Sequence, residues 1–216
     1  VLTAVAARLG LARSGGQAAL WLAMVLLGGL LALIGQTYQT GADTWELFSL
    51  WAVLALPWAF AGRHAAIWLL WIAVANLALG LWAETYSHPL RSSERSLSFV
   101  GLFDLALFLG WSFAMKRWAE FEGRVGPRLL AAAALLCTSL PAIGAALGGL
   151  EPRFGFELCA WLIVVVAMAA SALRLDRDRA MLAMIAVSAI GVSTVWWFQL
   201  ASVYLFARND EPAALW

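Results

Sequence analysis

Long apolar runs alternate with short polar breaks along the whole chain. Each run is close to the roughly 20 residues that an α-helix needs to cross a bilayer core of about 30 Å. Because backbone groups in lipid must bond within their own segment, each run predicts a helix and not a strand. The pattern therefore predicts an all-α, polytopic transmembrane helical bundle of about seven spans. They cover residues 17–34, 44–61, 65–83, 97–115, 128–150, 156–173 and 180–206.

The composition supports a membrane protein. Hydrophobic residues make up 63% of the chain and charged residues 12%, whereas an average soluble domain carries about 25% charged residues. A soluble fold of this size buries only about 70% of its surface and cannot hide so much apolar area. A soluble enzyme, a nucleic-acid-binding protein and a disordered tail are excluded, and the first expected partner is the lipid bilayer.

No polar segment is long enough for a soluble domain, so residues 17–206 are predicted to form one transmembrane helical domain. Residues 1–16 are predicted to form a partial or interfacial helix, and residues 207–216 a short outer tail. The chain opens with Val1 and not with Met, so we expect further chain upstream or a processed N-terminus.

The basic residues predict an orientation. Ten of the 14 Lys and Arg residues fall on one side of the predicted spans, and Arg91, Arg95, Arg153 and Arg208 fall on the other. Basic residues mark cytoplasmic loops. The side with ten is therefore predicted to face the cytoplasm, which places the C-terminus outside.

Asp104 is the strongest candidate for chemistry within the membrane. It lies in GLFDLALFLGW with apolar residues on both sides. An ionisable residue in a span is costly and is by default a functional candidate. No Lys or Arg lies in the interior of a predicted span, so burial favours the protonated carboxyl. Such a group suits proton coupling; the alternative is a neutral or hydrogen-bonded carboxyl that serves helix packing.

Other polar residues gather in the predicted outer halves of the spans. Gln36 and Tyr38 lie in the hydrogen-bond-rich segment IGQTYQTGADTWEL, and Glu157 opens the sixth span. The pattern predicts a polar pocket open to the outside. The alternative is that outer helix ends are simply polar, with Glu46 serving a capping box with Asp43. The candidate ligand-binding residues are Asp104, Asn76, Gln36, Tyr38, Glu46 and Gln199.

Signatures of catalysis are missing from the sequence. It has no HExxH, GxSxG or P-loop motif and no His/Cys cluster, so no catalytic residue, metal site or cofactor is predicted. Cys137 and Cys159 fall within apolar runs, which predicts buried, unpaired thiols. The 13 Trp residues favour packing and lipid contact over a chromophore or quinone site. An enzyme is therefore the least favoured class.

The stretch GGLLALIGQTYQTGADTWELFSLWAVLALPWAF, residues 28–60, resembles the signature region of a bacterial predicted-membrane-protein family, domain of unknown function 2157. The resemblance covers residues 17–83 and implies a bacterial inner-membrane protein with no established activity. It therefore supplies no catalytic residues. The residues that carry it are Gly35, Gln36, Tyr38, Gly41, Trp51, Ala52 and Pro57.

Two functions follow as hypotheses. The first is a transporter-like protein that binds or passes a small solute, an ion or a lipid headgroup through the outward-facing pocket, with Asp104 as its titrating group. The second is a non-catalytic scaffold subunit of a larger membrane complex. In that case the small-residue helix faces, such as the GxxxG of residues 144–148, would contact a membrane-protein partner or a second copy of the chain.

Overall fold

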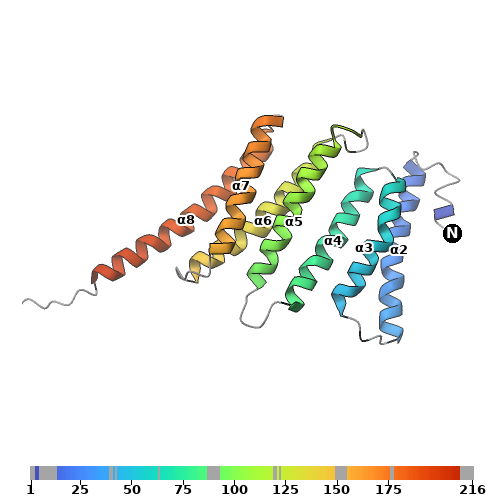
Figure 1. Ribbon diagram of the computed structural model, residues 1–216, viewed down its shortest axis with the longest axis horizontal. Coiled ribbons are helices and arrows are strands. Elements are labelled where there is room, and N and C mark those ends of the chain that lie inside the picture. Colours follow the sequence, from blue (N-terminus) through green and yellow to red (C-terminus); the bar gives the residue numbers. More distant parts are fainter. Residues whose placement is uncertain are drawn as a thin grey trace, which may run out of the picture. The chain divides into compact units, whose positions relative to one another are not determined.

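The computed structural model describes residues 3–4, 14–38, 41, 43–62, 64–86, 93–118, 121, 123–148, 155–175 and 178–209. Most of the predicted N-terminal helix, the tail from residue 210, and residues 87–92 and 149–154 of two predicted loops lie outside these. The described residues form helices and connections without strands (Figure 1). The helices are α2 (Ser14–Tyr38), α3 (Thr44–Gly62), α4 (Ala65–Tyr86), α5 (Ser93–Ala114), α6 (Val125–Leu147), α7 (Gly155–Leu175) and α8 (Arg179–Asn209).

All seven helices are long and apolar enough to cross a membrane. The predicted all-α transmembrane fold is therefore confirmed, and each helix coincides with one predicted span. Several helices are longer than the predicted apolar runs, because polar residues at their ends continue the helix. In α2 the Thr37 hydroxyl donates to the carbonyl of Leu33 at 2.7 Å, within the helix. The turn that follows contains Gly41 at a φ of 67°, a left-handed conformation that glycine adopts without strain.

The chain divides into two compact units. The first unit comprises Val1–Leu90 and Leu107–Pro127, and it contains α2, α3, α4 and the second part of α5. The second unit comprises Arg91–Ala106 and Arg128–Trp216, and it contains the first part of α5 with α6, α7 and α8.

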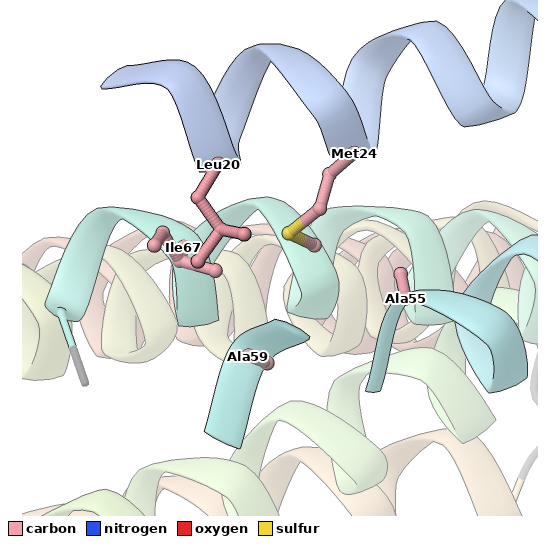
Figure 2. Packing of buried hydrophobic residues seen from close by; sticks show 5 residues of the cluster. All are labelled: Leu20, Met24, Ala55, Ala59 and Ile67. Atoms are coloured by element: carbon pink, nitrogen blue, oxygen red, sulfur yellow. The ribbon is translucent and has the colours of Figure 1, made fainter. Parts of the chain in front are cut away.

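An apolar cluster holds the first unit together. Figure 2 shows Leu20 and Met24 reaching from α2 towards Ala55 and Ala59 of α3 and Ile67 of α4. The two alanines leave room for the longer side chains of α2. Within a bilayer the hydrophobic effect does not drive helices together, so close packing and interhelical hydrogen bonds must do so.

Indole groups supply such hydrogen bonds in the first unit. Trp51 Nε1 of α3 donates to the carbonyl of Met24 in α2, and Trp71 Nε1 of α4 donates to the carbonyl of Ala52 in α3, both at 2.9 Å. The Trp51 ring lies against Gly28, where a Cβ atom would come within 2.5 Å of it. Gly28 therefore allows the indole to reach the backbone of α2.

A second aromatic group closes one end of the first unit. Phe121, in the connection after α5, contacts the rings of Trp68, Trp111 and Trp118 at centroid distances of 4.9 to 6.2 Å. Its carbonyl also accepts a long hydrogen bond from Trp111 Nε1 at 3.4 Å. The connection between α5 and α6 is thus packed against the unit by aromatic contacts.

The second unit has a small apolar cluster of its own, formed by Ala142, Trp161 and Val192. Trp196 Nε1 of α8 donates to the carbonyl of Ala142 in α6 at 3.1 Å. The deeper Trp residues were predicted to serve packing and lipid contact. The structure adds that the indole nitrogens of four of them bond to neighbouring helices, namely Trp51, Trp71, Trp161 and Trp196.

Candidate functional site

Among the described residues, polar or charged residues that are buried as a whole occur in only one of the two units. Seven polar or charged residues are buried, and all seven belong to the second unit. They come from α5, α6, α7 and the start of α8. They are Ser96, Ser98, Asp104, Thr138, Glu157, Ser171 and Asp178.

Asp104 is buried in the middle of α5, with only 1% of its surface exposed. One turn earlier, Gly101 lies directly against α6. A Cβ atom on Gly101 would lie 2.6 Å from Thr138 Cγ2, 3.1 Å from the carbonyl oxygen of Ala134 and 3.2 Å from Cys137 Cβ. Asp104 also interacts electrostatically with the Cys137 thiol. Because residues three apart share one face of a helix, Asp104 lies on the side of α5 that meets α6 at Gly101.

Two described residues with hydroxyl groups are completely buried on these helices, one on each. Ser98 and Thr138 are fully buried. Thr138 Oγ1 donates to the carbonyl of Ala134 one turn back in α6, at 2.8 Å. Because its hydrogen is used in this bond, the Thr138 oxygen can act only as an acceptor towards anything else.

A chain of hydrogen bonds crosses the second unit. Trp161 Nε1 of α7 donates to Ser188 Oγ of α8 at 2.9 Å, and Ser188 Oγ lies 2.8 Å from Ser139 Oγ of α6. Ser139 Oγ donates in turn to the carbonyl of Leu135 at 2.5 Å. With that hydrogen committed, Ser188 is the donor to Ser139. The chain runs in one direction and joins three helices.

Sequence analysis did not identify these two serines. Ser is only mildly polar, and Ser139 and Ser188 stand 49 residues apart. A weak signal existed: both interrupt otherwise apolar spans. Each group in this chain of hydrogen bonds has a partner within the chain. The hydrogen bonds therefore serve to hold α6, α7 and α8 together.

An ion pair links the beginnings of α5 and α7. Arg95 Nε lies 3.4 Å from Glu157 Oε1, and Glu157 is only 2% exposed. The Arg95 guanidinium also lies over the ring of Phe156 at 5.9 Å, and Phe156 contacts the ring of Phe99 at 5.4 Å. Glu157, predicted to open its span as a polar residue, is thus a buried partner of α5.

A second ion pair joins α6 to the start of α8. Arg128 Nε and Nη2 donate to the two carboxylate oxygens of Asp178, both at 3.0 Å. Asp178 Oδ1 also accepts the amide of Ala180 at 3.0 Å, which makes Asp178 the N-cap of α8. Bonding to the Arg128 guanidinium holds the pKa of Asp178 below its ordinary value, although burial opposes the shift. Sequence analysis did not identify this pair.

The six predicted ligand-binding residues are divided between the units. Asp104 and Gln199 belong to the second unit, and Gln199 is half-buried in α8. The other four belong to the first unit. There Asn76 is half-buried in α4, Gln36 and Glu46 are exposed, and Tyr38 ends α2 with a side chain outside the described set. A single pocket lined by all six stays a prediction.

Two smaller expectations meet mixed outcomes. Cys137 is half-buried, but Cys159 is exposed on α7, so the prediction of a buried thiol was wrong for Cys159. An apolar run places a cysteine in a span without saying which face it occupies.

The amide of Glu46 donates to the main-chain carbonyl of Asp43 at 3.0 Å, whereas a capping box would use the Asp43 side chain. In the described part of the chain, no three His, Cys, Asp or Glu residues group to hold a metal.

Comparison with known protein families gives one match. The model of the family described as "Predicted membrane protein (DUF2157)" matches residues 1–68, so the resemblance found in the sequence is confirmed. The matched stretch includes Gln36, Tyr38 and Glu46 and ends within α4. Comparisons with curated proteins and with solved structures gave no match.

Proposed function

We propose that the protein binds or passes a small solute, an ion or a lipid headgroup, with Asp104 as the titrating group. The observation that carries this proposal is the burial of Asp104 in the middle of a candidate membrane span. An ionisable side chain at this depth costs several kcal/mol by most estimates. A sequence that needed only packing at this position would be served by an apolar residue.

The surroundings of Asp104 support the same proposal. The second unit places the buried hydroxyls of Ser98 and Thr138 on the two helices that meet at Gly101. Buried polar groups on α5 and α6 make this part of the unit less apolar, which favours a carboxyl that changes its protonation state. We extend the proposal to the orientation predicted from the basic residues, with the pocket open to the outer side of a bacterial inner membrane.

The test uses Asp104→Asn in proteoliposomes that contain a trapped pH-sensitive dye. Amino acids, sugars and inorganic ions are added outside one at a time, at several pH values. We expect at least one addition to move protons in the parent protein and none to do so in Asp104→Asn. The amide keeps the shape of the carboxyl but cannot titrate, so the variant should fold.

Asp43→Asn is the matched control, because Asp43 is exposed and precedes α3 outside its span. It should behave as the parent does. Equal proton signals in the parent and Asp104→Asn would leave Asp104 a packing role only. No signal from the parent with any addition would remove proton-coupled passage.

The scaffold function is the second candidate, and α8 supports it. Its described side chains include several large apolar groups that the unit leaves uncovered, among them Trp197 at 72% exposure. Lipid or a partner helix must cover them. Purification from native membranes in mild detergent tests this candidate. A partner protein retained in fixed stoichiometry, and lost in Trp197→Ala, would favour the scaffold.

A further inference from the structure

A histidine side chain caps the N-terminus of α4. The amide of Ala66 donates to His64 Nδ1 at 3.2 Å. The amides of Ile67 and Trp68 donate to the main-chain carbonyl of the same histidine at 3.1 and 3.3 Å. The imidazole thus accepts one of the amides that the first turn of a helix leaves without a partner. Ser, Thr, Asp and Asn are the residue types preferred at this position, and none of them changes its charge near neutral pH.

The cap requires a neutral imidazole. Because the backbone amide is the donor, Nδ1 must accept with its lone pair, and both ring nitrogens become donors when the ring is protonated. An imidazolium would also place a positive charge at the positive end of the α4 dipole. Histidine is the side chain whose charge ordinarily changes between pH 5 and 8. The cap is therefore available to the neutral ring and not to the protonated ring.

The segments that meet the start of α4 carry few other titratable groups. α2 and the end of α3, which pack against Ile67, have no charged residue there. The connection between α5 and α6 contacts Trp68 through Phe121, and its described part has three basic residues, Lys116, Arg117 and Arg124. The charged residues of these segments that lie outside the described part are Arg13, Arg63, Glu120 and Glu122. Carboxyl, Lys and Arg side chains ordinarily titrate outside the range of histidine.

The first turn of α4 carries contacts that hold the first unit together. Ile67 is 1% exposed and lies in the apolar cluster with Leu20 of α2. Trp68 contacts the rings of Phe60 and Phe121 at centroid distances of 4.9 and 5.8 Å. Opening of this turn would therefore loosen the start of α4 from α2 and from the connection between α5 and α6.

We propose that His64 is a pH-sensitive cap of α4, which closes the first turn of the helix when the imidazole is neutral and opens it when the imidazole is protonated. The proposal concerns the first unit, and it does not rest on the proposed function, which concerns Asp104 of the second unit.

The start of α8 provides an internal reference. There Asp178 Oδ1 accepts the amide of Ala180. Bonding to the Arg128 guanidinium holds the pKa of Asp178 below its ordinary value, so this carboxylate stays ionised at about pH 5. The chain thus contains one cap that titrates between about pH 8 and pH 5 and one that does not.

Hydrogen–deuterium exchange in lipid nanodiscs tests the proposal. The readout is the exchange rate of the amides of residues 66–68 divided by that of residues 180–182 at the same pH, so that the intrinsic pH dependence of exchange cancels. In the parent this ratio should rise about three- to tenfold from pH 8 to pH 5, as expected for the loss of one cap. In His64→Asn the ratio should stay constant, because Asn is a good cap that does not titrate.

His88→Asn is the matched control, because it removes the other of the two histidines in the sequence. It should keep the response of the parent. His64→Ala lacks the side-chain cap at every pH and should show the raised ratio already at pH 8.

A constant ratio in the parent would overturn the proposal. An equal rise in His64→Asn would also overturn it, because another residue would then be the titrating group. If His64→Asn does not fold, the parent and His88→Asn decide together. A rise that both share supports His64 as the titrating cap, and a rise that His88→Asn abolishes rejects it.

Discussion

The two units bury different kinds of side chain. In the first unit Leu20, Met24, Ala55, Ala59 and Ile67 form an apolar core cluster, and every described polar or charged residue that is buried as a whole lies in the second unit. Both units are built from helices of similar hydropathy. Average hydropathy therefore says that a helix crosses the membrane but not whether its inner face is polar.

The family match follows the same division. It ends at residue 68 and so covers α2, α3 and only the start of α4, all in the first unit. Asp104, Glu157 and the serine chain lie outside it. The matched part of the chain thus contains the apolar cluster of the first unit, and the residues that are buried and polar lie in the other unit.

The largest effect is expected at the glycine contact of the second unit. Gly101→Ala should lower the free energy of unfolding by about 1–3 kcal/mol, because overpacking forces helices apart. Gly191→Ala, on α8 of the same unit, meets no atom within 4 Å and should be neutral or slightly stabilising. Thermal unfolding in detergent measures both. Equal stability of the two variants would mean that α5 and α6 are not in close contact.

The first unit offers the parallel pair. In Gly28→Ala the three atoms nearest to the new Cβ all belong to the Trp51 ring, whereas Gly29→Ala meets no atom within 4 Å. A ring can shift and give up its bond to Met24, but the backbone carbonyl beside Gly101 cannot. Gly28→Ala should therefore cost less than Gly101→Ala. If Gly28→Ala lost more stability than Gly101→Ala, this distinction between the units would be wrong.

A smaller effect should separate the two kinds of hydrogen bond. Ser188→Ala leaves the indole nitrogen of Trp161 without its acceptor, and a buried donor without a partner costs about 1–3 kcal/mol. Trp71→Phe removes a donor from the carbonyl of Ala52, which can still accept its intrahelical bond, so the bond itself should account for less than about 1 kcal/mol. Melting temperatures give the ranking. A greater loss in Trp71→Phe would show that indole bonds matter more in the apolar unit.

The smallest effect concerns Asp178. Asp178→Ala should cost about 1 kcal/mol, because it removes the N-cap of α8 and the partner of Arg128. Asp178→Asn keeps the cap and should cost less, since the Arg128 side chain is 39% exposed. The lowered pKa of Asp178 means that the ion pair stabilises the fold above the ordinary Asp value of about 3.9. This contribution is lost as pH falls through the lower folded pKa.

The pH dependence gives the check. Unfolding of the parent and Asp178→Asn is compared between about pH 7 and pH 3. The stability difference should shrink at the acidic end, because the unfolded parent then binds a proton that the folded ion pair resists. A constant difference across this range would show that the ion pair contributes nothing.

The sequence predicted the spans because twenty apolar residues leave the backbone one option in lipid. Helix ends were less exact: α2 runs from Ser14 to Tyr38, beyond the predicted 17–34, because polar residues at membrane interfaces can continue a helix. The burial of Asp104 could be inferred from its apolar neighbours. The Arg128–Asp178 pair could not, since its members stand 50 residues apart and pattern along a chain carries no information on such pairing.

The division of α5 between the units was also invisible in the sequence. Its apolar run is continuous, and nothing in it changes at residue 106. For the same reason a single pocket for the six candidate residues stays a prediction. Polarity and depth along each helix can be read from a sequence, but the direction in which each side chain faces depends on contacts between distant segments.

The unequal lengths of the helices have a consequence for the surrounding lipid. The apolar span of α8 has 26 residues and that of α3 has 19, which correspond to about 39 Å and about 29 Å. A hydrocarbon core of about 30 Å matches α3 but is too thin for α8. In such a bilayer α8 must tilt or thicken the lipid around it, each at a cost of fractions of a kcal/mol per ångström of mismatch. In a bilayer of this thickness the length of α8 is therefore mismatched to the lipid, whereas that of α3 is not.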